Sequence, residues 1–237
     1  MRLFYDPQIS GDFHVLNEEE SKHCTKVLRL SKGDEIYLTD GKGNMYRTEI
    51  LEIHQKKTVL KIIEIIADYG KRAYLIHIAI APTKNNDRFE WFVEKTTEIG
   101  IDEISPIICK NSERKFIKLD RLNRIAEAAM KQSQKAYHPK INEQVDFAKF
   151  ILQSFDYDQK FIAHCEDDLD KNYLGNLINK NESVIILIGP EGDFNSDEIQ
   201  MAKNAGFVPI SLGDSRLRTE TAGVVACDIC SVINKIN

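Results

Sequence analysis

The spacing of hydrophobic residues changes near residue 70, and this change divides the chain into two regions. Before it, short apolar runs predict five strands, over residues 3–5, 13–16, 35–39, 46–54 and 58–66. A short helix is predicted over residues 17–26, and Asp40-Gly41-Lys42-Gly43 is a strong hairpin turn signal. Five short strands with one helix predict a small β-barrel over residues 1–70, followed by a polar linker over 67–72.

From residue 73 onward, strand patterns alternate with helix patterns. Aliphatic runs predict strands over residues 74–81, 103–109, 160–165, 184–188 and 207–212. Apolar residues at helical spacing predict helices over residues 87–99, 118–135, 173–178, 196–205 and along 222–233. Pro106 interrupts one strand, so we expect a bulge there. This alternation predicts an α/β domain with a parallel sheet over residues 73–237.

Two of the predicted strands stop at glycines, Gly189 and Gly213. Because ligands bind beyond the carboxyl ends of parallel strands, a crevice is expected there. A glycine lets main-chain groups approach a planar ligand, although a tight turn explains either glycine alone. Arg216 and Arg218 flank Leu217, so one arginine can point into the crevice while the other stays in solvent.

Composition is ordinary for a globular protein, with 42% hydrophobic and 29% charged residues among 237. No apolar run approaches the roughly 20 residues of a membrane span, and no signal-peptide pattern is present, so we expect a cytoplasmic protein without membrane contact. Five cysteines without paired spacing predict reduced thiols. Cys227 and Cys230 are expected in the core rather than in a redox or metal site.

The net charge of −5 does not indicate a polyanionic partner, but the distribution of charge is uneven. Residues 110–140 contain nine Lys or Arg and three Asp or Glu, a local charge of +6. This stretch could follow phosphates, or it could be a solvated basic helix face. No dinucleotide, Walker, zinc-protease or nucleophile-elbow motif occurs, and the His and Cys residues are scattered, so no metal is expected.

Residues 187–194 (Leu-Ile-Gly-Pro-Glu-Gly-Asp-Phe) and 211–222 (Ser-Leu-Gly-Asp-Ser-Arg-Leu-Arg-Thr-Glu-Thr-Ala) closely resemble two signature segments of the RsmE family. Members of this family are ribosomal RNA small-subunit methyltransferases of the SPOUT class. Weaker matches extend the resemblance over nearly the whole chain: residues 1–4, 23 with 27–29, 33–34, 94–100, 112–114, 128–129 and 132–133.

The chain departs from the family pattern at two places. Asp193 stands where a second glycine is expected after Gly192, which we interpret as a solvent-side turn. Met130-Lys131 stands where the family usually has a Glu before the Gln-Ser pair, so no role is assigned to that acid.

The resemblance implies a PUA-like N-terminal β-barrel that recruits RNA and a C-terminal SPOUT domain tied in a trefoil knot, acting as a homodimer. The residues alone would predict an unknotted, doubly wound sheet, since threaded loops are rare. The implied cofactor is S-adenosylmethionine, with its adenine held mainly by backbone groups. The implied cofactor-binding residues are Ile188, Gly189, Leu212, Gly213, Leu217, Arg218, Thr221 and Ala222.

The implied activity is methylation of uridine N3 in 16S ribosomal RNA, as free RNA or in the small ribosomal subunit. A cation would stabilise the negative charge that develops on the uracil, and Arg218 is our candidate, with an intersubunit or loop-holding salt bridge as the alternative. Glu191 or Glu220 is the candidate proton acceptor, although a structural role is open for each. The residues expected to contact RNA are Arg2, His23, Arg29 and Arg114.

Two other functions are compatible with these residues. The first is a SPOUT 2′-O-ribose methyltransferase that acts on transfer or ribosomal RNA. The second is a non-catalytic RNA-binding protein that assists ribosome assembly. The intact glycine loops and Arg218 count against the second.

Overall fold

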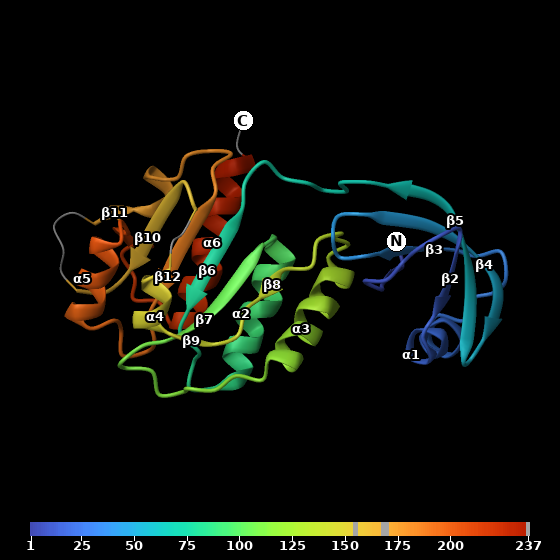
Figure 1. Ribbon diagram of the computed structural model, residues 1–237, viewed down its shortest axis with the longest axis horizontal. Coiled ribbons are helices and arrows are strands. Elements are labelled where there is room, and N and C mark those ends of the chain that lie inside the picture. The colour runs from blue at the N-terminus through green and yellow to red at the C-terminus, as the bar shows by residue number, and fades with distance from the viewer. Residues whose placement is uncertain (154–155, 167–170, 236–237) are drawn as a thin grey trace. The chain divides into compact units, whose positions relative to one another are not determined.

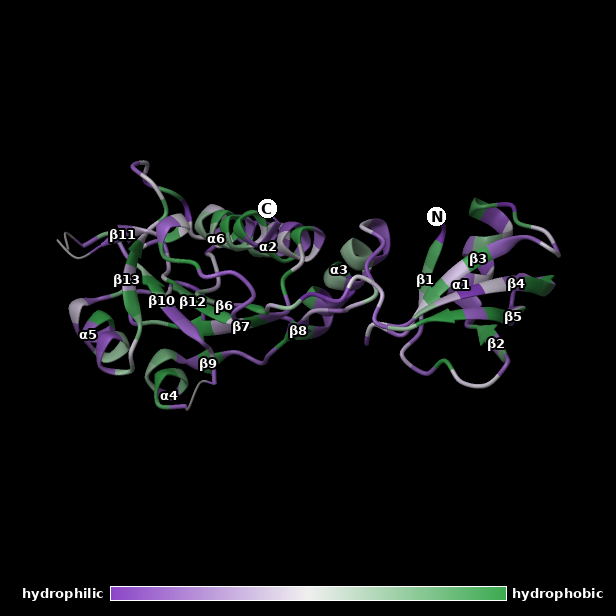
Figure 2. Cartoon of the chain, turned by 90° about the horizontal axis from the view of Figure 1, so that it is seen from above, coloured by the Kyte–Doolittle hydropathy of each residue, from purple (hydrophilic) through white to green (hydrophobic). Residues whose placement is uncertain are grey.

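The computed structural model describes residues 1–153, 156–166 and 171–235. The chain forms two compact units. The first comprises Met1–Lys71 and Met130–His138, and the second comprises Arg72–Ala129 and Pro139–Asn237. Figure 1 labels most of the helices and strands of the two units, and Figure 2 also labels β1 and β13.

The first unit is built on a five-stranded sheet with the order β1-β3-β4-β5-β2. Its strands are β1 (Leu3–Tyr5), β2 (Phe13–Leu16), β3 (Glu35–Thr39), β4 (Met45–His54) and β5 (Lys57–Ile66). One short helix, α1 (Glu18–Lys22), continues into a π-helical turn over His23–Val27. The sheet curls around a core that includes Ile36, Leu38, Ile50 and Leu60. It is a half-barrel, because β1 and β2 end the strand order instead of pairing with each other.

The hairpin turn between β3 and β4 is confirmed, and Asp40 organises it. The Asp40 carboxylate accepts hydrogen bonds from the backbone N–H groups of Lys42 (2.8 Å) and Asn44 (3.1 Å) and from the Asn44 amide (2.6 Å). Burial by itself raises the pKa of Asp40, but these hydrogen bonds outweigh it and leave the pKa below its ordinary value. The carboxylate therefore replaces the backbone partners that the turn lacks.

The second unit contains an eight-stranded sheet, and every strand pairing described in it is parallel. The strand order is β11-β13-β10-β12-β6-β7-β8. The eighth strand, β9, pairs with the last residues of β7, after the part of β7 that pairs with β8. The strands are β6 (Ile76–Ile80), β7 (Glu103–Ile108), β8 (Lys140–Ile141), β9 (Val145–Asp146), β10 (Gln159–Ala163), β11 (Asn172–Tyr173), β12 (Val184–Ile188) and β13 (Val208–Ser211). The predicted parallel α/β fold is thus confirmed.

Helices cover both faces of this sheet, so its central strands are buried on both sides. Figure 2 shows α2 (Asn86–Ile99) and α6 (Thr219–Lys235) on one side, and α4 (Phe147–Ile151) and α5 (Ser196–Asn204) on the other. The residues of α3 (Leu119–Gln132) that lie in the second unit pack into the α2 and α6 core.

Local capping signals explain where the helices begin and end. Asn195 forms the predicted capping box with Glu198 at the start of α5. Asn85 caps α2, and Gly100 ends that helix with φ +123°, a conformation that favours glycine.

Several details differ from the sequence predictions. Pro106 causes no bulge, because β7 pairs with β6 in continuous register through Ile80 and Pro106. Along its other edge, β7 pairs with β8 before Pro106 and with β9 after it. Proline has no backbone N–H, and no strand hydrogen bond is needed from Pro106 on that edge. The helix predicted over 173–178 is instead the end of β11 and a 3₁₀ turn, Leu174–Asn176. Helix α4 was missed, since five residues are too few to show a period.

Helix α6 approaches α2 and β6 closely at Gly223. A Cβ atom at this residue would lie 2.5 Å from Cε2 of Phe92 and 2.9 Å from Cδ1 of Ile80. Cys227 and Cys230 continue the same buried face, which confirms that these thiols belong to the core. The missing side chain of Gly223 therefore sets the distance at which α6 packs.

We expect Gly223→Ala to lower the free energy of unfolding by about 1–3 kcal/mol, because the added methyl group overfills a packed core. Chemical denaturation of the purified protein measures the change. Val232 is 44% exposed on the same helix, and Val232→Ala should stay within about 0.5 kcal/mol of the wild type. Equal stabilities for the two variants would contradict the close packing.

A polar network lies at the amino end of β6 and β7. Nε2 of the buried His77 lies 2.8 Å from the Ser105 hydroxyl, which also accepts a hydrogen bond from Asn142 (2.7 Å). Asn142 and Lys140 donate to Oε1 of Glu103 at 2.6 and 2.9 Å. Burial lowers the pKa of His77 to about 4, opposed by the charge of Glu103 and assisted by that of Lys140.

His77 should therefore make the protein less stable in mild acid. The unfolded chain binds a proton at His77 below about pH 6.5, whereas the folded chain does so only near pH 4. Between these values the free energy of unfolding should fall with decreasing pH, by at most about 1.4 kcal/mol per pH unit from this group. His77→Gln should show a shallower pH dependence in denaturation experiments at pH 4–6.5. Parallel curves for the two proteins would contradict the assignment.

Candidate functional site

The largest pocket described in the second unit lies at the carboxyl ends of three adjacent strands, β13, β10 and β12. Its volume is about 660 Å³, within the range of small-molecule and cofactor sites. His164, Gly189 and Leu212 directly follow these strands, and all three line the pocket. The crevice predicted beyond the glycine-ended strands is therefore present.

Most of the residues predicted to bind a cofactor meet in this pocket. Thr221 does not line it and lies half-buried in the first turn of α6. The predicted residues that do line the pocket are Ile188, Gly189, Leu212, Gly213, Leu217, Arg218 and Ala222.

Thr219 fastens the start of α6 to the end of β12. Its buried hydroxyl donates a hydrogen bond to the Gly189 carbonyl at 3.0 Å, across 30 residues of sequence. The loop before it is shaped by Ser211, whose hydroxyl bonds both the N–H and the carbonyl of Gly213 at 3.1 Å. Sequence reasoning missed Thr219 and Ser211, although their types at a helix start and before a glycine turn are suggestive.

The two glycines at the strand ends are required for different reasons. Gly213 has φ +128°, which other residues rarely adopt, and a Cβ there would have open space around it. Gly189 has no such strain, but a Cβ would lie 3.0 Å from the ring of Phe194 and 3.1 Å from its backbone nitrogen. The conformation of the turn therefore explains Gly213, and close packing by Phe194 explains Gly189.

Asp193 lines the pocket in a left-handed conformation, with φ +62°. This conformation explains why a glycine suits the position, and Asp is among the few other residues that tolerate it. The Asp193 carboxylate accepts hydrogen bonds from the N–H groups of Cys165 (2.6 Å) and Phe194 (2.9 Å). The residue interpreted as a solvent-side turn therefore joins the loops that follow β10 and β12.

The two glutamates proposed as proton acceptors occupy different places. Glu191 lines the pocket, with Oε1 held by the backbone N–H of Lys84 at 2.9 Å. Its Oε2 is buried and has no hydrogen-bond partner in the described part of the chain. Glu220 is 6% exposed, does not line the pocket and has Oε1 3.7 Å from Nε of Arg88. The pocket thus contains one of the two predicted carboxylates.

Both arginines that flank Leu217 line the pocket. Arg216 and Arg218 are exposed, and neither side chain has an ion pair or hydrogen bond with any residue that the structure describes. A loop-holding salt bridge within this chain is therefore not the role of Arg218 in the described structure. Both guanidinium groups are available to a ligand.

The residues predicted to contact RNA are divided between the two units. Arg2 and Arg29 are exposed in the first unit, as is His23, whose Nδ1 lies 3.5 Å from Glu20. Arg114 lies in the second unit and is half-buried. Its guanidinium donates hydrogen bonds to backbone carbonyl oxygens, including that of Lys84 at 2.7 Å. Arg114 therefore braces the loop after β6.

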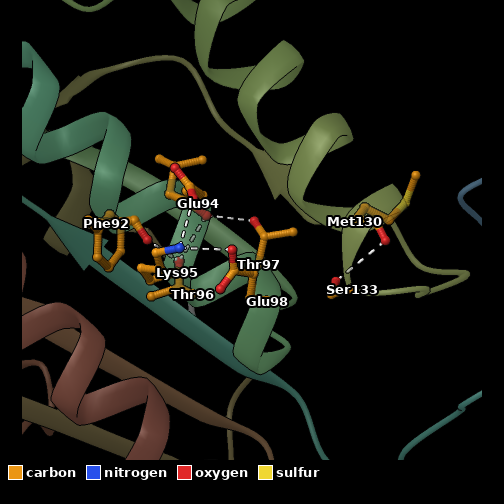
Figure 3. Close-up of polar contacts among 9 residues, drawn as sticks. Phe92, Glu94, Lys95, Thr96, Thr97, Glu98, Met130 and Ser133 are labelled. Atoms are coloured by element: carbon orange, nitrogen blue, oxygen red, sulfur yellow. Dashed lines mark hydrogen bonds and ion pairs between the residues drawn. The ribbon is translucent and has the colours of Figure 1, made fainter. Parts of the chain in front are cut away.

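The family-like segment at residues 94–100 stabilises α2 itself (Figure 3). The hydroxyl groups of Thr96 and Thr97 donate to helix carbonyls four residues earlier, at 2.8 and 2.7 Å. Lys95 pairs with Glu94 at 2.7 Å and with Glu98 at 2.9 Å. These residues support the helix and do not line the pocket.

The other departure from the family pattern lies at the end of α3, within the first unit. Met130 is fully buried, and the Ser133 hydroxyl donates to its carbonyl at 3.4 Å (Figure 3). Lys131 forms an ion pair with Glu20 of α1 at 2.9 Å. A basic residue here thus serves an internal contact.

Neither a metal site nor a membrane span emerges from the described residues. No group of three or more His, Cys, Asp or Glu side chains among them could hold a metal ion. No helix in the described ranges is both long and apolar enough to cross a bilayer.

Comparison with known families matches both units. Residues 71–231 match the RNA methyltransferase domain family, and residues 16–64 match the RNA methyltransferase PUA domain family. The first match alone covers more than half of the chain. The α/β unit with its parallel sheet is therefore SPOUT-like, and the curled half-barrel is a PUA domain.

Individual relatives agree over nearly the full length. Ribosomal RNA small subunit methyltransferase E of Mesomycoplasma hyopneumoniae is 34% identical, over 97% of this chain and 99% of its own. A crystal structure of a probable rRNA-methyltransferase from Porphyromonas gingivalis has a TM-score of 0.89 and 41% identity, covering 96% and 95% of the two chains. The Neisseria gonorrhoeae methyltransferase E, bound to S-adenosyl methionine, is 25% identical with a TM-score of 0.84, again covering 96% and 95%. With its pocket, its paired domains and these relatives, the chain belongs to the ribosomal RNA small subunit methyltransferase E family.

Proposed function

We propose that this protein transfers a methyl group from S-adenosylmethionine to N3 of one uridine in 16S ribosomal RNA. The observation that carries the proposal is the pocket at the carboxyl edge of the sheet. It joins two glycine-ended loops, Arg218 and a carboxylate oxygen of Glu191, and neither of these two side-chain groups has a partner among the described residues. The Neisseria gonorrhoeae relative, which is bound to S-adenosyl methionine, supports the choice of cofactor.

The pocket suits S-adenosylmethionine in size and in chemistry. Its volume of about 660 Å³ accommodates a nucleoside with an amino-acid chain. Ile188, Leu212 and Leu217 offer apolar surface to the adenine, and the backbone of the loops offers hydrogen bonds. Glu191 and Asp193 place carboxylates where a cationic ligand benefits from them. When bound, this cofactor supplies an electrophilic methyl group.

The reaction requires that uracil N3 lose its proton and that the negative charge on the ring be stabilised. Arg218 is fixed at the start of α6, whose first turn is held by the hydrogen bond between Thr219 and Gly189. From there its guanidinium can stabilise the charge that develops on the uracil oxygens. Glu191 is favoured over Glu220 as proton acceptor, because its Oε2 belongs to a pocket-lining residue while Glu220 faces Arg88.

We further propose that residues 1–70 recruit the RNA and that the domain over 73–237 carries out transfer as a homodimer with a trefoil knot. Arg2, His23 and Arg29 would contact phosphates without reading sequence. Arg114 would act on RNA only indirectly, through the loop that it braces. Since ribosomal RNA is the substrate, the protein is expected in the cytoplasm.

Deleting the gene should remove one N3-methyluridine from 16S ribosomal RNA, and the purified protein with S-adenosylmethionine should restore it. Mass spectrometry of nuclease fragments locates the methyl group on the base or on the ribose. A methyl group on the 2′ oxygen would replace the proposal with the 2′-O-methyltransferase alternative. No methyl transfer, together with no cofactor binding in calorimetry, would favour the assembly-factor alternative.

Arg218→Ala should lower the rate of methyl transfer by roughly 10²–10³-fold, the usual cost of removing one charge-stabilising donor. Cofactor affinity, measured by calorimetry, should change much less, since the backbone provides most of the contacts. Arg216→Ala is the matched control, because Arg216 also lines the pocket and is also unpaired among the described residues. Equal losses in the two variants, or unchanged turnover in Arg218→Ala with intact cofactor binding, would remove Arg218 from the mechanism.

A further inference from the structure

Phe116 is a large aromatic side chain that lies in solvent on the second unit. It is 64% exposed, in the loop of residues 109–118 that follows β7. The next residue, Ile117, is only 8% exposed. The loop therefore already contributes an apolar side chain to the core, and that contribution does not explain Phe116.

The loop that carries Phe116 is held in place along its length. The N–H of Cys109 donates to the Ser112 hydroxyl at 2.9 Å, and the N–H of Lys110 donates to Glu198 at 2.8 Å. On the other side of Phe116, the N–H of Ile117 donates to the Gln144 side chain at 2.8 Å. A side chain on such a loop is presented to solvent in a defined place, which lowers the entropy cost of binding.

Two lysines are close neighbours of Phe116 in the sequence. Lys115 and Lys118 are exposed, and neither forms an ion pair with a described residue. Phe116, Lys118 and Arg114 line one cleft of about 200 Å³, together with Asp87 and the ion pair between Glu90 and Arg121. An exposed aromatic ring among cations is the usual arrangement for single-stranded nucleic acid, in which a base stacks on the ring and phosphates meet the cations.

This loop also contacts the loop that borders the proposed cofactor pocket. The Asn111 amide donates to the carbonyls of Gly192 and Asp193 at 3.0 and 3.1 Å. Asp193 lines the pocket. Moreover, β7 is separated from β12 by only one strand, and both end at the same edge of the parallel sheet. An RNA strand that enters the pocket therefore passes close to the loop of Phe116.

We propose that Phe116 stacks on a base of the substrate RNA next to the methylated nucleotide, while Lys115 and Lys118 contact its phosphates. This inference rests on the proposed function and adds a substrate-positioning residue to it. It also gives a specific meaning to the excess of positive charge over residues 110–140. Arg114 connects the loop of Phe116 to the loop after β6, because its guanidinium donates a hydrogen bond to the Lys84 carbonyl.

The test uses the full-length protein and small ribosomal subunits from a strain that lacks it. Phe116→Leu keeps an apolar side chain but removes the ring, and Phe116→Trp keeps a stacking surface. We expect Phe116→Leu to weaken RNA binding and to lower kcat/KM for RNA by roughly 5–100-fold, the usual range for loss of one stacked base. Phe116→Trp should retain both, and neither variant should alter cofactor affinity in calorimetry.

The lysines give an independent measurement. Lys115→Ala with Lys118→Ala should reduce the slope of log affinity against log salt by roughly 0.7 per lysine, as for single-stranded contacts.

Leu152→Ala is the matched control for Phe116→Leu, because Leu152 is 82% exposed at the end of α4, on the opposite face of the sheet from α2 and α6. This control should leave RNA binding and turnover unchanged.

Two results would overturn the inference. The first is a Phe116→Leu variant that binds and methylates RNA like the wild type. The second is a Phe116→Leu variant whose oligomeric mass in light scattering differs from that of the wild type. That result would make Phe116 a contact between copies of the chain. If the wild type itself transfers no methyl group, the proposed function fails, and the binding comparison of Phe116→Leu with Phe116→Trp still decides on stacking.

Discussion

The structure depends on parallel pairing, which brings the ends of β6, β7, β10, β12 and β13 to one edge of a single sheet. Parallel strands cannot be joined by tight hairpins, so long connections meet at this edge with unpaired backbone groups. Side chains from neighbouring loops satisfy these groups. Thr219 bonds Gly189, Glu191 bonds Lys84, and Asn111 bonds Gly192. Gly189, Glu191 and Thr219 among these residues line the pocket, so the contacts hold its walls in place.

Much of the fold could be predicted because its signals are local. The aliphatic run at Val184–Ile188 has the composition of a strand buried on both faces, and Asn195 with Glu198 has the spacing of a capping box. The elements that were missed lack such signals. Helix α4 and strands β8 and β9 are two to five residues long, and they exist because the sheet offers them a place to pack. Likewise, nothing local states whether five strands close into a barrel or stop as a half-barrel.

The site shows the same limit. Gly189, Gly213 and Arg218 could be found from their neighbours in sequence, and family resemblance extended the set. The contacts that fix the pocket join residues far apart: 30 residues between Gly189 and Thr219, and 107 between Lys84 and Glu191. Residue type alone could not assign these partners. Gly189 was identified from the sequence, but the reason that a glycine is required there was not. The Phe194 ring, which leaves no room for a side chain at residue 189, lies outside the strand pattern.

Helix α6 and the residues just before it form one side of the pocket, and they are the last part of the described chain to be synthesised. Residues 217–219 and Ala222 border the pocket, and α6 follows every other described element along the chain. The helix docks where Gly223 meets Phe92 of α2 and Ile80 of β6. A growing chain therefore lacks one side of the ligand site until this last described helix has been synthesised. Truncation within that helix would remove Ala226, Cys227 and Cys230 from the core as well as one side of the pocket, so stability and ligand retention are coupled through the same helix.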